Sequence, residues 1–598
     1  VKGLGLAALR GAYRLTTSLQ ASATANDRKR LAAEALMMEA SQLARQGNKT
    51  AQQVIEKCEQ AQAIWQELGE SSWVANSLVK IGVAHNSLNR SDKGIASLEK
   101  ALAMYLQNKN RSGEGTALSN LGIYYGGISQ TEKAISYFEQ ELAIHRELKD
   151  RRGEARVLSN LGLGYMFLSE YEKALAFLQE GLPITKELND QFFEGRMLST
   201  IGTVNGRMGR YETAVDYHEQ ALQISRTVKD QLGVGNTLMT LGNIYSFINR
   251  GDKSINYYDQ ALAIFREIKY RVGEGNTLSS LGNIHQNLRE YEKAIEYYDQ
   301  ALAIFREAKF RSGEATALNN LAEVNVKLRK TEKALAYLEQ SLALAREAKN
   351  RYGEQVALIR TGAALRQIDK LDQSLALLTE GLAISRAIGD RSFEIKALID
   401  LALTEDRRGN LAQARVRIEE ALQRIESIRA TAVLSPESRR ALFSDSQGAH
   451  HLYTDLLMRM HQSEPTKGFD VLAVETSERQ RARSLLDQLL EASLNITEGV
   501  DPALVERERL LGRQLNDKAQ RLLQATKPEQ AAALKQEISQ LETDYERSQA
   551  AIRKASPRYA ALTQPQPLKL PQIQALLDAD SLMLEYTLGE DSGYLFAI

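Results

Sequence analysis

The sequence predicts an all-α protein whose main part is an array of stacked helix pairs. The pair Gly113-Glu114 recurs in register at multiples of forty residues, at Gly153-Glu154, Gly273-Glu274, Gly313-Glu314 and Gly353-Glu354. The segment YYDQALAIFRE occurs at 257–267 and again at 297–307. A fixed period of this length is typical of solenoid repeats. The 598 residues contain only nine prolines, which suits long uninterrupted helices.

Each unit reads as two helices. In the unit that begins at Gln231, the segments GVGNTLMTLGNIYSFIN and INYYDQALAIFREI both carry apolar residues at helical spacing, and NRGDKS separates them. We expect nine such units from about Ser71 to about Ala430, and a weaker tenth at 31–70. Six first helices are preceded by an asparagine or aspartate that we expect to cap them. These residues are Asn110, Asp150, Asp190, Asp230, Asn350 and Asp390.

A glycine recurs inside the first helix of seven units, and alanine takes its place in two. The glycines are Gly82, Gly122, Gly162, Gly202, Gly242, Gly282 and Gly362, and the alanines are Ala322 and Ala402. Because an interior glycine costs a helix about 0.8–1 kcal/mol, seven of them cost roughly 6 kcal/mol. We expect close approach of the second helix to offset this loss. Small residues on that helix fit the expectation: Ala134, Ala174, Ala214, Ala294, Ala334, Ala414, Ser254 and Ser374.

The order of these residues resembles the tetratricopeptide repeat. One unit shows the whole pattern, in Leu241-Gly242, Tyr245, Ser254, Tyr258 and Ala261. The units lack the usual closing proline and are about six residues longer than the minimal repeat. The array is therefore similar to the long-repeat proteins of this family, such as kinesin light chains. The resemblance implies a right-handed superhelix whose first helices line the concave side.

Polar residues gather on the face of the first helices that lies opposite the apolar stripe. Asparagines recur there, at Asn120, Asn160, Asn236, Asn243, Asn276, Asn283 and Asn320. A merely solvated face would favour Lys and Glu, whereas a carboxamide both donates and accepts, as an extended peptide backbone requires. We predict that a protein or extended peptide binds in this concave groove. Arg156 and Arg196 would add a preference for acidic side chains. The alternative is that duplication copied a neutral surface residue along the array.

The regular period ends after Ala430. We expect a lead-in at 1–30, the array at 31–430, a helical linker at 431–500 with Ser435 as a cap, and a helical hairpin at 501–560 that turns at Thr526-Lys527. Its sparse apolar seam resembles a short antiparallel coiled coil. Within the last segment, 561–598, LMLEYTL and YLFAI read as two strands around a turn. An isolated hairpin is marginal in water, so this one needs a packing partner or further strands.

The segments ETSERQRARSLLDQL, GVDP, SPRYAALTQPQPL and LMLEYTLGEDSGYLFAI resemble a known arrangement. They are similar to the region between repeats and catalytic fold in bacterial proteins that join tetratricopeptide repeats to a CHAT domain, a caspase-like module. The resemblance implies that the final hairpin opens an α/β domain and that the sequence stops at its threshold. It also implies that the repeats are the recognition and regulatory arm of a peptidase.

In that family the catalytic histidine and cysteine lie beyond the opening hairpin. No residue of this chain can inherit their roles, so we expect the chain to bind and not to cleave. The alternative is a non-catalytic assembly or signalling scaffold whose CHAT-like end is degenerate. Cys58 is expected to pack inertly, and His85 and His285 replace the core tyrosines of sister units.

Other functional classes find little support in the sequence. We expect no cofactor and no metal, because His450, His451 and His461 lack metal-ligand spacing. The balance of 76 basic and 76 acidic residues speaks against nucleic acid, and no apolar run is long enough to span a membrane. Arg479, Arg481 and Arg483 are expected to form a solvated face paired with Glu475 and Glu478. A cytoplasmic location is expected, or export if the N-terminus is a trimmed signal peptide.

Overall fold

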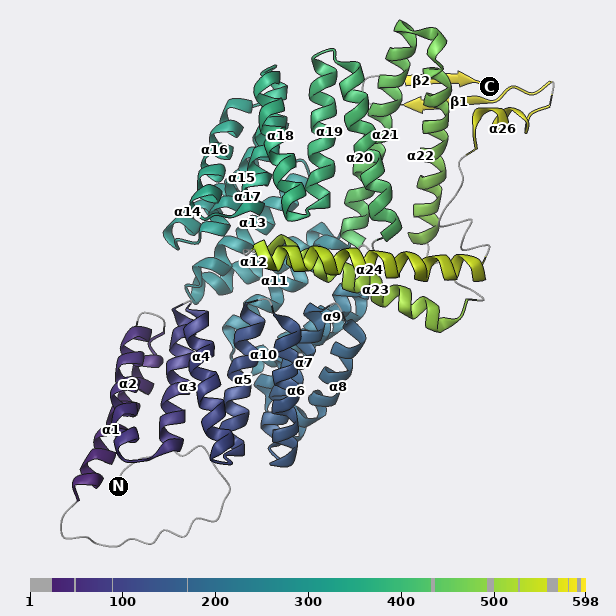
Figure 1. Ribbon diagram of the computed structural model, residues 1–598. Helices are drawn as coiled ribbons and strands as arrows, with labels where there is room; N and C mark the ends of the chain where they lie inside the picture. Colours follow the sequence, from purple (N-terminus) through teal and green to yellow (C-terminus); the bar gives the residue numbers. More distant parts are fainter. Residues whose placement is uncertain are drawn as a thin grey trace. The chain divides into compact units, whose positions relative to one another are not determined.

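The computed structural model describes residues 24–47, 50–88, 90–128, 130–168, 170–431, 436–491, 500–524, 528–556, 568–578, 580–588 and 593–598. Its internal contacts divide the chain into two compact units, residues 1–160 and 161–598. Helices dominate both units, and one two-stranded sheet lies near the C-terminus (Figure 1). The predicted all-α class is therefore confirmed, with its small β-hairpin.

The first unit consists of consecutive antiparallel helix pairs. Its helices are α1 (Ala25–Ala44), α2 (Ala51–Glu67), α3 (Ser71–Ser87), α4 (Ser91–Gln107), α5 (Arg111–Gly127), α6 (Thr131–Glu147) and the first part of α7 (Arg151–Phe167). The weaker tenth unit of the prediction is thus present as α1 and α2. Its first helix begins at Ala25, earlier than the sequence pattern indicated, because Thr24 caps it and exchanges hydrogen bonds with Asp27.

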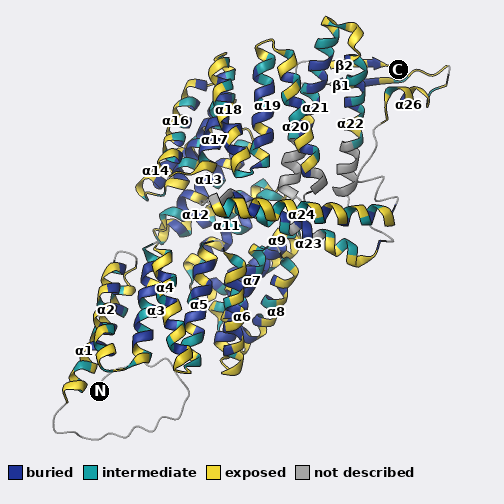
Figure 2. Cartoon of the chain, in the orientation of Figure 1, coloured by how far each residue is buried: buried dark blue, intermediate teal, exposed yellow. Residues whose placement is uncertain are grey.

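The second unit continues the same pairing. Its repeat helices after α7 are α8 (Tyr171–Glu187), α9 (Gln191–Arg207), α10 (Tyr211–Thr227), α11 (Gln231–Phe247), α12 (Gly251–Glu267), α13 (Arg271–Asn287), α14 (Tyr291–Glu307), α15 (Arg311–Lys327), α16 (Thr331–Glu347), α17 (Arg351–Gln367), α18 (Leu371–Ile388), α19 (Arg391–Arg407) and α20 (Leu411–Thr431). Odd-numbered helices are the first helices of the repeats, and even-numbered helices are the second. Buried residues form a stripe along each helix (Figure 2).

The six predicted helix caps are confirmed. In each, the side-chain oxygen of the asparagine or aspartate accepts the backbone N–H three residues later, at 2.9–3.3 Å. Each cap satisfies one of the backbone donors that the start of a helix leaves unpaired. The forty-residue period therefore fixes where each of these first helices begins.

The recurring glycines permit the close helix approach that the sequence predicted. A β-carbon at Gly242 would lie 2.6 Å from Cε1 of Tyr258, and one at Gly282 would lie 2.5 Å from Cε1 of Tyr298. The Ser254 hydroxyl also donates to the Gly242 carbonyl at 2.8 Å. The large side chain of the second helix thus occupies the space that a side chain on the first helix would need.

Substituting leucine for Gly242 is expected to lower the free energy of unfolding by about 1–3 kcal/mol, because the new side chain overpacks against Tyr258. Gly448 provides a matched control, since it lies within a helix and a β-carbon added there would have no heavy atom within 4 Å. Leucine at Gly448 should be neutral or slightly stabilising. Urea denaturation of both variants measures the difference. Equal changes in stability at the two positions would show that close packing against Tyr258 does not explain the glycine at 242.

A buried glutamate near the start of the first helix recurs along the array. Glu274, Glu314, Glu354 and Glu394 have side chains that are only 7–10 % exposed. Each accepts a hydrogen bond at 2.9–3.0 Å from Nε of an arginine eight residues earlier, at the end of the preceding second helix. Glu154 and Arg146 form the same pair in the first unit. These charge-assisted bonds join each repeat to the next.

His218 on α10 occupies the position of Tyr258 in the next repeat and is fully buried. Burial lowers the pKa of His218 to about 4. The folded state therefore disfavours protonation, while the unfolded chain protonates at the ordinary pKa near 6.5. The stability that neutral His218 contributes is complete above pH 6.5 and is lost progressively as the pH falls toward 4.

Lowering the pH from 7.5 to 5 is expected to destabilise the second unit by about 1–2 kcal/mol through His218, at 1.4 kcal/mol per pKa unit. The variant His218→Leu should lack this part of the pH dependence, because Leu178 fills the same position in the preceding repeat. Thermal melts at both pH values provide the measurement. Identical pH dependence in the wild type and the variant would contradict the assignment.

The chain after the array continues to pack against it. The next helices are α21 (Pro436–Ser463), the short 3-10 helix η2 (Pro465–Lys467) and α22 (Phe469–Glu491). One core cluster contains buried residues from α17 to α22, among them Leu401, Ile418, Leu457 and Val474. Ser435 and the rest of 432–435 lie outside the described residues.

The C-terminal hairpin packs on α21 and α22. It follows the short helix α26 (Leu570–Gln574) and consists of β1 (Leu584–Leu588) and β2 (Gly593–Ala597), paired antiparallel with Leu584 opposite Ala597. Phe596 joins the core cluster of the helices, and the Tyr594 hydroxyl donates to Oδ1 of Asp455 at 2.6 Å. The hairpin therefore has the packing partner that its marginal stability requires. Its turn, 589–592, lies outside the described residues.

The predicted helical hairpin is formed by α23 (Pro502–Gln524) and α24 (Pro528–Ala555). Leu511, Leu515 and Tyr545 are buried between the two helices. Lys535 Nζ donates to the Ala387 carbonyl at 2.7 Å, and Arg391 pairs with Glu542, so the hairpin contacts the turn between α18 and α19. Thr526-Lys527, and most of the segment SPRYAALTQPQPL, lie outside the described residues.

Candidate functional site

The first helices of the second unit lie next to one another along one side of the repeats. Consecutive first helices, such as α11 and α13 or α13 and α15, contact each other more than consecutive second helices do. Helices that approach one another more closely occupy the inner side of a curved stack. The inner face of this unit is therefore made of first helices, as the sequence predicted for the concave side.

Asn236 on α11 and Asn276 on α13 occupy equivalent positions and are exposed. Neither carboxamide has a hydrogen-bond partner among the residues that the structure describes. Both amide donors and the acceptor oxygen are consequently available to a bound chain. Asn160, in the first unit, is partly exposed and likewise has no side-chain partner within the described part of that unit.

Asn243 and Asn283, two turns further along the same helices, are exposed, and their side chains make hydrogen bonds within the protein. The hydroxyl of Tyr258 donates to Oδ1 of Asn243 at 2.6 Å, and that of Tyr298 donates to Oδ1 of Asn283 at 2.7 Å. Burial raises the pKa of both tyrosines, which keeps the phenols protonated. The oxygen of each carboxamide is thereby held toward the core, and its two N–H donors are directed away from that bond.

Asn320 and Asn120 make bonds within the protein. Nδ2 of Asn320 donates to Oδ1 of Asn283 at 3.4 Å, which joins α13 and α15. Nδ2 of Asn120 donates to the Thr116 carbonyl of its own helix at 2.8 Å. The structure therefore brings Asn283 and Asn320 together, whereas the carboxamides of Asn236 and Asn276 stay free within the described residues.

The two arginines of the predicted site are held in different ways. Nη2 of Arg156 donates to Oε1 of Glu141 at 3.1 Å, and the Glu141 side chain is completely buried. The Arg196 guanidinium lies over the rings of Phe192 and Phe193, 6.0 and 5.7 Å from their centroids. Both arginines remain exposed. Each is thus oriented by its neighbours without being covered.

The sequence reasoning did not assign the exposed apolar residues of the same helix face to the binding site. Val83 on α3 and Ile123 on α5 are 44 % and 52 % exposed. They stand at the repeat position that Asn243 and Asn283 occupy in later units. A comparison of positions 83, 123, 243 and 283, which the forty-residue period makes equivalent, would have shown that this position is apolar in the first unit and an asparagine in these later repeats. In the first unit this position offers an apolar contact in place of an amide.

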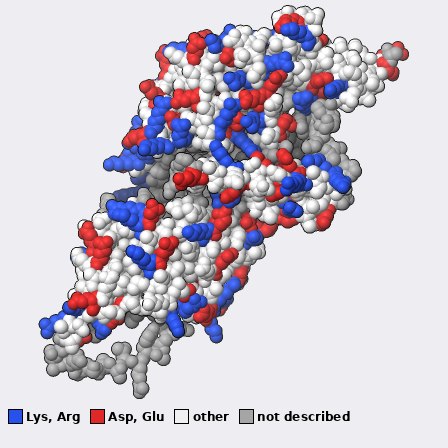
Figure 3. Space-filling model, in the orientation of Figure 1, with Lys and Arg blue, Asp and Glu red and all other residues white. Residues whose placement is uncertain are grey.

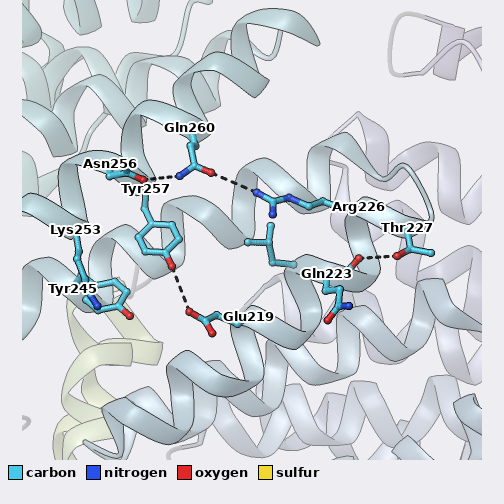
Figure 4. Close-up of a pocket in the computed structure, with 10 residues that line it drawn as sticks. Glu219, Gln223, Arg226, Thr227, Tyr245, Lys253, Asn256, Tyr257 and Gln260 are labelled. Carbon is cyan, nitrogen blue, oxygen red and sulfur yellow. Dashed lines mark hydrogen bonds between the residues drawn. The ribbon is translucent and has the colours of Figure 1, made fainter.

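A separate cleft of ≈ 650 Å³ lies on the second helices of the second unit (Figure 4). It is lined by Glu219, Leu222, Gln223, Arg226 and Thr227 from α10, Tyr245 from α11, and Lys253, Asn256, Tyr257 and Gln260 from α12. The rings of Tyr245 and Tyr257 are stacked with centroids 5.3 Å apart. The sequence reasoning did not single out this site, because its residues come mainly from second helices.

The remaining candidate residues behave as packing residues. Cys58 is completely buried, and burial raises the pKa of its thiol to about 11, which disfavours the reactive thiolate. His85 and His285 are buried, and His285 stacks on Tyr297. Within the described ranges, no group of three or more metal-ligating side chains is present. Among those ranges, too, no helix is long and apolar enough to cross a membrane.

One arginine of α22, Arg481, meets the C-terminal hairpin. Arg481 pairs with Glu478 at 3.3 Å, as predicted, and its Nη2 also lies 2.6 Å from Oε1 of the buried Glu585 on β1. The side chain of Arg483 lies outside the described part. On the face shown in Figure 3, Lys and Arg are interspersed with Asp and Glu. This mixed surface agrees with the overall charge balance.

The repeated helix pairs define the array as a helical-repeat scaffold. A family model described as Tetratricopeptide repeat matches residues 110–187, 193–267 and 274–347, and a second model of the same description matches 75–108. The repeats within these matched residues are therefore tetratricopeptide repeats, as the Leu-Gly-x-x-Tyr pattern indicated. A comparison with curated proteins found no match to the chain.

Several solved structures are similar in fold. The quorum sensor NprR from B. thuringiensis is 14% identical, with 60% of this chain and 99% of that chain covered and a TM-score of 0.41. Aspartyl phosphate phosphatase F from Bacillus subtilis is 15% identical, with 62% and 96% covered and a TM-score of 0.39. A signal transduction ATPase with a tetratricopeptide repeat sensor from Pyrococcus horikoshii is 18% identical, with 52% and 49% covered and a TM-score of 0.40. The chain thus spans about half the length of that ATPase.

Proposed function

We propose that the tetratricopeptide array binds an extended peptide or an extended segment of a protein along the inner face formed by its first helices. The observation that carries this proposal is the pair of free carboxamides, Asn236 and Asn276, at the same position in consecutive repeats. One repeat thus follows another with the same unused donor and acceptor groups. A peptide backbone carries such groups along its whole length and can satisfy them in turn.

The other predicted residues would add to the inner face of the unit in which each of them lies. Asn243 and Asn283 present N–H donors, because buried tyrosines hold their oxygens. Arg156 and Arg196 each add an oriented guanidinium that suits a carboxylate on the ligand. Asn120 and Asn320 offer partly used amides, and the Asn160 carboxamide has no partner within the described part of its unit. In the first unit, Val83 and Ile123 add exposed apolar side chains to the face formed by its own first helices.

A library of random dodecapeptides displayed on phage and selected on the full chain tests this function. The recovered peptides are then compared on the full chain with alanine in place of both Asn236 and Asn276. One group of peptides should bind the wild-type chain and should be lost on the double variant. If every recovered peptide binds both chains equally, or if no peptide is recovered, recognition by the inner face is wrong.

We further propose that the array serves as the recognition and regulatory arm of a bacterial, cytoplasmic caspase-like CHAT peptidase. The motifs between residues 475 and 598 support this assignment through their resemblance to that family. The packing of the hairpin on α21 and α22 agrees with it, since those helices share one core with the last repeats. Such a continuous core could transmit ligand binding from the repeats to the hairpin.

The coding sequence beyond Ile598 tests the peptidase assignment. A His-Gly pair and a later cysteine, each at the end of a strand, are expected if the hairpin opens a catalytic module. Their absence would favour the alternative, in which the chain is an assembly scaffold with a degenerate CHAT-like end. Fractionation of the source cells would test the cytoplasmic location.

A further inference from the structure

The cleft on the second helices contains an arginine that lacks the partner of its sister residues. Arg266, Arg306, Arg346 and Arg386 each donate from Nε to a buried glutamate eight residues later. In three of these repeats, a second arginine, five residues after the first, donates to the same glutamate. In these three repeats, the glutamate carboxylate therefore lies between two guanidinium groups, at the point where one repeat meets the next.

Arg226 occupies the same position forty residues before Arg266, but the rest of the arrangement is missing. Val234 stands in place of the glutamate, and Gln231 stands in place of the second arginine. Val234 is 4 % exposed and packs in a cluster with Leu222 and Leu238. The exposed Arg226 guanidinium has a single hydrogen-bond partner among the described residues, Oε1 of Gln260 at 3.4 Å. The Arg226 guanidinium thus lacks the glutamate carboxylate that the equivalent arginines of the later repeats bind.

The Arg226 guanidinium lies among the residues that line the cleft and points toward Gln260 (Figure 4). Glu219 is the acidic residue of the lining, and it accepts a hydrogen bond from the Tyr257 hydroxyl at 3.4 Å. Glu219 and Arg226 are two turns apart on α10, which separates their backbones by about 10 Å. Lys253 is the second cation of the lining, and its Nζ lies 5.0 Å from the centroid of the Tyr245 ring. The lining therefore contains two cations, Arg226 and Lys253, and one carboxylate, which already accepts a hydrogen bond from Tyr257.

We propose that this cleft binds an acidic segment of a partner polypeptide. In this arrangement, an Asp or Glu side chain of the partner supplies to Arg226 the carboxylate that a glutamate of the chain itself supplies in the sister repeats. The partner's backbone runs beside Tyr257, where the exposed carboxamides of Gln223 and Asn256 are within the same lining. Charge complementarity selects this occupant, because a guanidinium binds a carboxylate with two parallel hydrogen bonds. The site lies mainly on second helices and contains none of the asparagines of the inner face.

Two substitutions test the proposal from opposite directions. Arg226→Gln removes the guanidinium and keeps hydrogen-bonding capacity. Val234→Glu restores in cis the carboxylate of the sister repeats and should occupy Arg226 while the cleft remains open. Val234→Leu is the matched control, because it changes the same buried position without a charge. Should the buried glutamate prevent folding, Arg226→Gln remains a complete test on its own.

The measurement is the binding affinity of fluorescent peptides, which are chosen from the dodecapeptide selection on the full chain. Each peptide is compared with a version of itself in which one Asp or Glu is replaced by Asn or Gln. One group of peptides should share a fixed Asp or Glu and should bind at least about tenfold more weakly to Arg226→Gln and Val234→Glu. The same loss is expected when that acid is replaced by its amide. Val234→Leu, and the double alanine variant of Asn236 and Asn276, should bind this group as the wild type does.

The proposal is overturned if no acidic group of peptides is recovered, or if that group binds Arg226→Gln as tightly as the wild type. Displacement of the peptides from Arg226 by inorganic phosphate at equal concentration would assign the site to small anions and would also overturn it. Loss of this group on the double asparagine variant would place it on the inner face instead. Failure of the cleft and failure of the inner face are therefore distinguishable.

Discussion

The full chain carrying alanine in place of both Asn236 and Asn276 is expected to bind an inner-face peptide at least about 30-fold more weakly than the wild type. Hydrogen bonds of this kind contribute about 0.5–1.5 kcal/mol each. Two carboxamides that each donate to and accept from a peptide backbone should together contribute about 2 kcal/mol or more. Since 1.4 kcal/mol corresponds to a tenfold change in affinity, the loss follows.

The thermal stability of this double variant should remain close to that of the wild type. Both side chains are exposed and have no partner in the described structure, and alanine has the higher helix propensity. Asn325→Ala is the opposite control, because Asn325 is 2% exposed and its Nδ2 donates to the Leu321 carbonyl at 2.7 Å. That variant should lose stability and keep binding. Equal losses of stability and binding in the double variant would show that the asparagines are structural.

Truncation of Tyr298 to alanine is expected to lower the free energy of unfolding by about 3–5 kcal/mol. Tyr298 is completely buried, and its ring fills the space opposite Gly282. Its hydroxyl also donates to Asn283, so the truncation removes a hydrogen bond as well as packing. Tyr270 is the matched control, because it is 40 % exposed, and alanine there should cost far less.

The next repeat shows which pair of residues should compensate for the loss of the Tyr298 ring. One repeat later, Ala322 and Leu338 are both buried where Gly282 and Tyr298 stand. The double variant Gly282→Ala with Tyr298→Leu copies that pair and should be clearly more stable than Tyr298→Ala. Urea denaturation of the three chains provides the comparison. No difference between the double variant and Tyr298→Ala would show that glycine and the large side chain are not paired in packing.

Features governed by local sequence were predictable. The caps at Asn110 and Asp230 depend on one side chain and the helix start three residues away, so the period and the residue type suffice. Gly242 was informative because an interior glycine, which lowers the stability of a helix, recurs at the same position in most repeats. Its actual neighbour, Tyr258, lies sixteen residues later in the same unit and obeys the same register.

Features that depend on distant or missing residues were not predictable in the same way. The hairpin packs on α21 and α22 through Asp455 and Ser477, more than a hundred residues from their partners Tyr594 and Thr587, and no repeat connects them. The difference between free Asn236 and engaged Asn243 arises from a phenol on another helix. The signal at Arg226 is the absence of a glutamate, which becomes visible only once the sister pairs are known.

Site-directed photocrosslinking tests the central account most directly. A benzoylphenylalanine at Thr240, which lies between Asn236 and Asn243 on α11, is placed on the inner face, whereas one at the exposed Glu339 of α16 is placed on a second helix. A peptide whose binding depends on Asn236 and Asn276 should crosslink to the first chain and not to the second. Crosslinking at position 339 with none at position 240 would contradict recognition by the first helices.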